Sequence, residues 1–211
     1  MDEPIHVNAP DLVAKWNDWN LNHAPRYPNS VLVQHVYRHF GRDMDHSSIK
    51  VLDFGCGAGV NTFFFAENGF DTSGCDIADR ALQRADETLS KQSLVARFGQ
   101  LADFEHEKFD FLASVHVLEC IPESLLHEQL ARLFEMVATG GRGFFITKSA
   151  ADKGNQRSND GNLHGFTRDE LVSLFALGLF EEVHIDTYDL TFKNGLERQS
   201  DWVVSFKASS I

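Results

Sequence analysis

From about residue 50 onward the chain alternates between short apolar runs and longer segments of helical periodicity. Apolar runs of strand length lie at 50–54, 70–75, 94–98, 109–115 and 142–147. Between most of them apolar residues recur at helical spacing, as in "DRALQRADETLS" and in "PESLLHEQLARLFEMVATGG", which has Gly140 just past its expected end. Such strands, joined by helices, are typical of a parallel sheet covered on both faces. Segment 99–108 is the exception, because it is too polar and too short for a full helix.

The N-terminal part of the chain predicts two helices before the first strand. Asp11 can cap a short helix that carries Trp16 and Trp19, and two prolines that follow in the sequence break it. In "SVLVQHVYRHFG", Ser30 can cap the start of a second helix and Gly41 can end it. The aromatic rings of the first helix can cover a ligand or simply seal the edge of the sheet.

The C-terminal part of the chain predicts one more helix and two strands. "TRDELVSLFALG" begins with a capping box of Thr167 and Glu170 and ends at Gly178. "LFEEVHIDTYDLTF" and "SDWVVSFKA" predict two strands joined so directly that they should be antiparallel. The predicted fold is α/β, a Rossmann-like doubly wound sheet of seven strands, mostly parallel with one antiparallel strand near the C-terminus. We expect an N-terminal helical lid at residues 1–48 and the main domain at residues 49–211.

Composition and charge remove several classes of partner. The 211 residues are 43% hydrophobic and 24% charged, which suits one globular domain with a sizeable core. The formal net charge of −12 opposes binding to nucleic acid, because no segment is rich in Lys and Arg. No apolar stretch reaches membrane-spanning length, and the N-terminus lacks the features of a signal peptide. Three scattered cysteines indicate reduced thiols, so we expect a cytoplasmic protein. We also expect no membrane partner, and either a monomer or a homodimer.

The stretch "VLDFGCGAG", residues 51–59, carries the main candidate chemistry. A strand that ends in alternate glycines and opens a helix brings backbone N–H groups close to a ligand. A dinucleotide site needs Gly-x-Gly-x-x-Gly, whereas the third glycine here comes one residue earlier, at Gly59. Asp53 lies immediately before the turn, where it would repel a diphosphate and attract a cationic or zwitterionic ligand.

Five motifs in order resemble the class I S-adenosylmethionine-dependent methyltransferases. "VLDFGCGAG" is similar to the first motif of that family, and "FDTSGCDIADRAL" to its second strand. "FDFLASVHVLECIP" resembles the fourth strand, "ATGGRGFFI" the fifth, and "GFTRDELVSLFALGLFEEV" the last helix with the sixth strand. The resemblance covers about residues 50 to 207. It implies S-adenosyl-L-methionine as the cofactor and S-adenosyl-L-homocysteine as its product.

The resemblance also implies which residues bind the cofactor. Asp76, at the end of the second strand, would bind the ribose hydroxyls. Where the family commonly has Gly-Asp after the third strand, this chain has Gly99-Gln100, so either Gln100 or Asp103 would accept from the adenine amino group. The implied cofactor-binding residues are Asp53, Gly55, Cys56, Gly57, Gly59, Asn61, Asp76, Ile77, Gln100, Leu101 and Val115.

His116 directly follows the fourth strand and is the candidate catalytic residue, because histidine can accept a proton near neutral pH. It can equally shape the acceptor pocket without moving a proton, since many methyl acceptors need no base. Glu119 is either a weaker acid–base candidate or a solvated charge. The candidate residues for binding the methyl acceptor are Trp19, Tyr27, Lys148 and His164. His35 and His39 are spaced i, i+4 without an evident third ligand, so no metal site is predicted.

The sequence therefore predicts a methyltransferase that acts on a small-molecule acceptor. O- or N-methylation by in-line transfer is the expected reaction, in which the protein mainly holds the reacting atoms in line and excludes water. Two alternatives stay open: a non-catalytic S-adenosylmethionine-binding regulatory protein and a protein methyltransferase.

Overall fold

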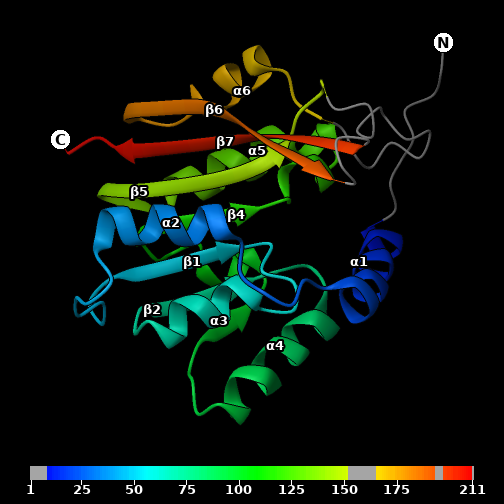
Figure 1. Ribbon diagram of the computed structural model, residues 1–211, viewed down its shortest axis with the longest axis vertical. Coiled ribbons are helices and arrows are strands. Elements are labelled where there is room, and N and C mark those ends of the chain that lie inside the picture. Colours follow the sequence, from blue (N-terminus) through cyan, green and yellow to red (C-terminus); the bar gives the residue numbers. More distant parts are fainter. Residues whose placement is uncertain (1–8, 152–164, 193–196, 211) are drawn as a thin grey trace. The chain divides into compact units, whose positions relative to one another are not determined.

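The computed structural model describes residues 9–151, 165–192 and 197–210, and the chain divides into two compact units, Met1–Ala113 and Ser114–Ile211. Seven strands follow the hydrogen-bonded order β3-β2-β1-β4-β5-β7-β6. Figure 1 labels these strands, except β3, and the α-helices of each unit. The seven-stranded Rossmann-like sheet predicted from the sequence is confirmed.

The strands of the first unit include the parallel set β1, β2 and β3. They are β1 (Lys50–Phe54), β2 (Asp71–Cys75), β3 (Arg97–Gly99) and most of β4 (Phe109–Val115). β2 pairs in parallel with β1 on one side and with β3 on the other. In β1 and β2 every residue after the first is buried. Continuous burial of this kind is expected when both faces of a sheet are covered.

Five helices accompany these strands. They are α1 (Ala9–His23), α2 (Ser30–Phe40), α3 (Val60–Glu67), α4 (Asp79–Lys91) and the short 3-10 helix η1 (Leu101–Phe104). The 3-10 helix η1 occupies the polar connection for which the sequence excluded a full helix. Phe65 on α3 is fully buried, and its ring lies 5.7 Å from Phe70 and 6.0 Å from Phe111 between ring centroids. These aromatic rings form much of the core of the unit.

Two predicted helix caps in the first unit are wrong. The cap of α2 is Asn29, not Ser30, because the Asn29 side-chain oxygen accepts from the N–H groups of Val31 and Leu32 at 2.9 and 3.1 Å. α1 begins at Ala9, so Asp11 lies in its first turn and does not precede it. An acidic side chain in the first turn still stabilises a helix through the helix dipole.

The second unit contains the antiparallel strand that the sequence predicts. Its strands are β5 (Val137–Lys148), β6 (Phe180–Phe192) and β7 (Glu197–Ala208), and its helices are η2 (Leu118–Cys120), α5 (Glu123–Glu135) and α6 (Arg168–Phe175). β7 runs antiparallel to both β5 and β6. The capping box of α6 is present, since Thr167 N donates to Glu170 at 2.7 Å.

The predicted end of α5 is wrong. The helix stops at Glu135, and β5 starts two residues later. Gly140, expected just past the helix, lies inside β5 with a φ of 71° and donates to the Ser209 carbonyl at 3.1 Å. The pairing of this segment with the C-terminal end of the chain outweighs its local preference for helix.

Candidate functional site

The alternate glycines form a tight turn at the end of β1. Gly55, Gly57 and Gly59 have φ values of 70°, 53° and 79°, in the left-handed region that residues with a Cβ rarely adopt. The N–H groups of Gly55 and Cys56 both donate to the Cys75 carbonyl, at 2.8 and 3.0 Å. These two hydrogen bonds hold the turn against the end of β2.

Asp76 lies directly against this turn. One carboxylate oxygen accepts from Gly57 N and the other from Ala78 N, both at 2.9 Å. Burial raises the pKa of Asp76, while the N–H groups of Ala78 and Gly57 act in the opposite direction. Next to it, Ile77 is exposed. The arrangement places an acidic group and an exposed apolar side chain side by side at the end of β2.

Asp53 is a buried carboxylate beside the same turn. Its side chain accepts from the Thr62 hydroxyl at 2.6 Å, and the residue is almost fully enclosed. Burial raises the pKa of Asp53, the hydrogen bond from Thr62 lowers it and the nearby charge of Asp76 raises it, and together these effects bring the pKa to about 7. A cation placed against Asp53 would offset this cost of burial. The site therefore fits a ligand with a positively charged group.

Cys56 and Asn61 serve the local structure of the turn. Burial raises the pKa of the Cys56 thiol well above its ordinary value, which keeps the sulfur protonated and unreactive. The Asn61 side-chain oxygen accepts from Asn29 N at 3.0 Å, so α3 is joined to the start of α2.

Both candidates for adenine recognition take part in the capping box at the start of η1. Asp103 accepts from Gln100 N at 2.8 Å, and the Gln100 side chain accepts from the backbone N–H of Asp103. Both residues are exposed, and Gln100 Nε2 also donates to Asp79 at 3.5 Å. Leu101 follows as the first residue of η1. The two side chains are therefore alike in exposure and in their part in the cap.

Helix α1 covers the glycine turn, a contact that the sequence does not reveal. Asn20 is buried, and a Cβ on Gly57 would clash with its side-chain oxygen. Arg84 on α4 donates to the carbonyl groups of Asn20 and Leu21 at 3.0 and 2.9 Å. Asn17 in turn accepts from the backbone N–H of Arg80 at 2.9 Å. The sequence contains one signal for this contact, namely Asn17 and Asn20 at i and i+3 in the predicted helix. Asparagine is a poor helix former, so its presence there can indicate a role in a contact.

The aromatic side chains of the N-terminal region remain accessible. Trp19 is 42% exposed and stacks on His23, with 6.2 Å between ring centroids, while Trp16 meets it edge to face. Tyr27 is 81% exposed. Both predicted acceptor-site residues of this region thus have surface available for a ligand.

His116 lies in a cluster of buried polar groups in the second unit. It has a φ of 58°, unusual for a residue with a side chain, and its N–H donates to the Ile146 carbonyl at 2.8 Å. Its Nδ1 donates to Glu119 at 3.0 Å, and Glu119 also accepts from the Thr147 hydroxyl at 2.8 Å. On the other side of the ring, Nε2 lies 3.7 Å from Asp201 Oδ2.

This cluster favours the protonated imidazole. Burial lowers the pKa of His116, but the hydrogen bond and charge of Glu119 and the charge of Asp201 outweigh it, so the net shift is upward. Lys148 acts weakly in the opposite direction. Glu119 is a buried partner of His116, and its reading as a solvated charge is wrong. Val115 ends β4 just before this cluster, whereas His164 lies outside the described residues.

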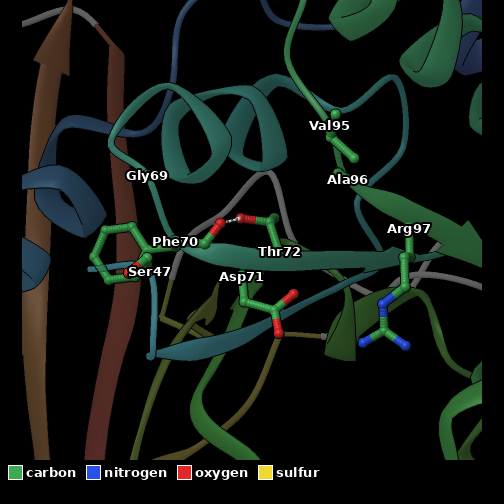
Figure 2. Close-up of a pocket in the computed structure, with 8 residues that line it drawn as sticks. All are labelled: Ser47, Gly69, Phe70, Asp71, Thr72, Val95, Ala96 and Arg97. Atoms are coloured by element: carbon green, nitrogen blue, oxygen red, sulfur yellow. Dashed lines mark hydrogen bonds between the residues drawn. The ribbon is translucent and has the colours of Figure 1, made fainter. Parts of the chain in front are cut away.

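One cavity of the first unit lies away from the glycine turn. It has a volume of about 340 Å³ and is lined by Ser47, Gly69, Phe70, Asp71, Thr72, Val95, Ala96 and Arg97 (Figure 2). Asp71 and Arg97 begin β2 and β3, whereas the candidate cofactor residues follow the opposite ends of the strands. Arg97 Nη1 forms a salt bridge with Glu107 Oε1 at 2.6 Å. The cavity therefore does not include the predicted site.

Within the described ranges, no group of three or more His, Cys, Asp and Glu side chains is arranged to hold a metal ion. In the same parts of the chain, no helix has the length and apolar character needed to cross a bilayer.

Comparison with known proteins identifies the family. Residues 28–187 match the model of the methyltransferase domain family. The chain therefore belongs to this family, which its fold and glycine turn identify as the class I S-adenosylmethionine-dependent methyltransferase family.

Two curated relatives carry the name ubiquinone biosynthesis O-methyltransferase. The protein of Methylococcus capsulatus is 30% identical over 110 residues, which cover 48% of this chain and 46% of the relative. That of Photobacterium profundum is 28% identical over 143 residues, covering 65% and 59%. The chain spans about half the length of the curated relatives it matches.

Solved structures share the fold at low sequence identity. The 1,6-didemethyltoxoflavin-N1-methyltransferase of Burkholderia thailandensis, solved with 1,6-didemethyltoxoflavin and S-adenosylhomocysteine, is 19% identical with a TM-score of 0.72, covering 99% of this chain and 93% of that one. TehB from Haemophilus influenzae is 18% identical with a TM-score of 0.68, covering 92% and 67%.

Proposed function

We propose that this protein transfers the methyl group of S-adenosylmethionine to an oxygen or nitrogen atom of a small-molecule acceptor. The observation that carries the proposal is the position of Asp53 and Asp76 against a turn of three glycines, in a chain of the methyltransferase family. Relatives named for O-methylation in ubiquinone biosynthesis and a structural neighbour named for N-methylation support a small acceptor.

Each group at the turn has a separate part in holding the cofactor. Asp76 accepts from the ribose hydroxyls, Asp53 offsets the charge of the amino group, and the glycines let the backbone come close. Ile77 and Leu101 provide apolar contact for the adenine, and Gln100 accepts from its amino group. When bound, the cofactor supplies a methyl group on a cationic sulfur.

The acceptor side of the reaction is assigned to His116 and to the variable segments. His116 is fixed in orientation by Glu119, so its Nε2 is the ring atom left to face an acceptor. Trp19, Tyr27, Lys148 and His164 are each proposed as further acceptor-binding residues. The N-terminal helices, residues 1–48, are proposed as the lid, which the contact of α1 with the glycine turn supports.

The test is a methyl-transfer assay with labelled S-adenosylmethionine and a panel of phenols, catechols, amines and thiols. We expect turnover with at least one hydroxyl or amine acceptor. In His116→Ala we expect cofactor affinity to be largely retained and turnover to fall by about 100-fold, the usual contribution of a positioned acid–base group. Binding of the cofactor with no turnover across the panel would instead indicate a non-catalytic binding protein, and turnover only on peptides would indicate a protein methyltransferase.

A further inference from the structure

Asp201 in β7 has a buried carboxylate oxygen without a hydrogen-bond partner among the described residues. Its side chain is 2% exposed, and Oδ1 accepts no hydrogen bond. The other oxygen, Oδ2, accepts from Gln199 Nε2 at 2.7 Å. A buried acceptor that stays unpaired is costly, and such a group in a folded protein calls for an explanation.

The neighbours of Asp201 are those of the candidate catalytic residue. Oδ2 lies 3.7 Å from His116 Nε2, on the side of the ring opposite Glu119. In the sheet, Asp201 is directly opposite Lys148 of β5 and Tyr188 of β6. The charged groups that face His116 are therefore Glu119 from η2, Lys148 from β5 and Asp201 from β7.

The charges around Asp201 select the kind of ligand that can approach it. Two buried carboxylates, Glu119 and Asp201, face a single imidazole. Burial raises the pKa of Asp201, and the charge of His116 only partly reverses this. A ligand hydrogen donated to Oδ1 would stabilise the ionised carboxylate, whereas an anion would be repelled.

We propose that Asp201 Oδ1 accepts a hydrogen bond from the O–H or N–H group of the methyl acceptor, which makes Asp201 an acceptor-binding residue. This assignment rests on the proposed methyl-transfer function. It restricts the acceptor to a neutral or cationic hydroxyl or amine that still carries a hydrogen. Glu119 is a positioning residue in this arrangement, because it holds the His116 ring with Nε2 turned toward Asp201.

Fragment binding monitored by NMR of the histidine ring nitrogens tests the proposal in the full chain. The probes are catechol against its dimethyl ether, benzylamine against benzyltrimethylammonium, and benzoate as the anion. We expect catechol and benzylamine to shift the His116 signals and to bind about tenfold or more tightly than their methylated counterparts, the effect of one hydrogen bond to a charged group. Benzoate should not bind there.

Substitutions test whether Asp201 itself, and not a neighbouring group, gives the preference for the donor-bearing probes. Asp201→Asn keeps the shape of the side chain but removes its charge, and we expect it to lose the preference for the donor-bearing probes. The control is Asp186→Asn, an exposed carboxylate on β6, which should bind the probes as the unmodified protein does. Backbone amide spectra of each variant establish that it is folded. With a turnover acceptor, Asp201→Asn should raise KM more than it lowers kcat.

Several results would overturn the proposal. Equal binding of methylated and unmethylated probes, unchanged preference in Asp201→Asn, or no probe reaching His116 at all would each mean that Oδ1 is satisfied by water alone. Failure of the proposed function is a different result, namely no binding of S-adenosylmethionine in a calorimetric titration, and it is measured without these probes.

Discussion

Asp53 and Asp76 show how single residues can specify the charge of a ligand. Both carboxylates are largely buried beside one turn, and burial raises the pKa of each. Asp76 is compensated by two backbone N–H groups, whereas Asp53 has only hydrogen bonds from Thr62 to offset its burial. A diphosphate would add to this unfavourable charge, and an ammonium group would relieve it.

The affinity for S-adenosylmethionine should therefore depend on pH through Asp53. Its pKa of about 7 is raised in the free protein, and a bound ammonium group favours the ionised form, so binding releases a proton below that pH. We expect affinity to fall by up to about tenfold per unit as the pH drops below about 7. Calorimetry in buffers of different ionisation enthalpy measures both the affinity and the released proton.

Asp53→Asn is the matched variant for this measurement. It keeps an oxygen that can accept from Thr62 but cannot ionise, so the affinity should be weaker and nearly independent of pH below 7. An unmodified protein whose affinity does not change between about pH 6 and pH 8 would contradict the role given to Asp53.

His116 should titrate above the ordinary histidine range because of Glu119. Burial alone would lower the pKa of His116, and the hydrogen bond from its Nδ1 to Glu119 reverses that effect. We expect NMR titration of the ring to give a pKa above 6.5 and Glu119→Gln to lower it. The pKa of His116 is raised only in the folded protein. The ion pair of His116 with Glu119 therefore stabilises the fold fully below pH 6.5, and this stabilisation is lost as the pH rises through the pKa of His116 in the folded protein. A lower pKa in the unmodified protein than in Glu119→Gln would refute this.

Among the helices, α1 and α4 stabilise each other through their ends. The Arg84 side chain satisfies two carbonyl groups at the C-terminal end of α1, and Asn17 satisfies an N–H at the N-terminal end of α4. α1 has few other polar contacts to hold it in place among those described, so its position over Gly57 depends on these bonds.

Arg84→Met should loosen α1 while leaving α4 folded. Hydrogen bonds from a charged donor contribute about 1.5–3 kcal/mol, so we expect amide hydrogen exchange in α1 to become about tenfold faster or more. Arg80→Met is the control, since only the backbone N–H of Arg80 takes part in the contact. Equal exchange in both variants would show that α1 is held by its apolar contacts alone.

The sequence predicts the strands and helices well where a local pattern decides them. The buried strands β1 and β2, the capping box at Thr167 and the glycine turn all follow from neighbouring residues. Predictions fail where a distant segment decides. Gly140 lies in a strand because residues near the C-terminus pair with it, a partner that periodicity cannot reveal.

For the candidate site too, the sequence does not predict contacts between residues that are far apart along the chain. Asp53, Asp76 and His116 could be chosen as candidates because each lies at a strand end beside a recognisable motif. The contacts of Asn20 with Gly57 and of Asp201 with His116 join residues far apart in sequence. Apart from the low helix propensity of Asn20, nothing in the local pattern marks them. The net charge of −12 is unfavourable for binding nucleic acid, but it does not indicate which ligand is bound.

Calorimetric titration with S-adenosylhomocysteine tests the central assignment most directly. We expect saturable binding at one site per chain, abolished in Asp76→Ala and strongly weakened in Asp76→Asn. Asp86→Asn, an exposed carboxylate on α4, should bind as the unmodified protein does. Unchanged affinity in both Asp76 variants, or tight binding of a nicotinamide dinucleotide in place of S-adenosylhomocysteine, would contradict the assignment of the glycine turn to a nucleoside with a cationic amino acid group.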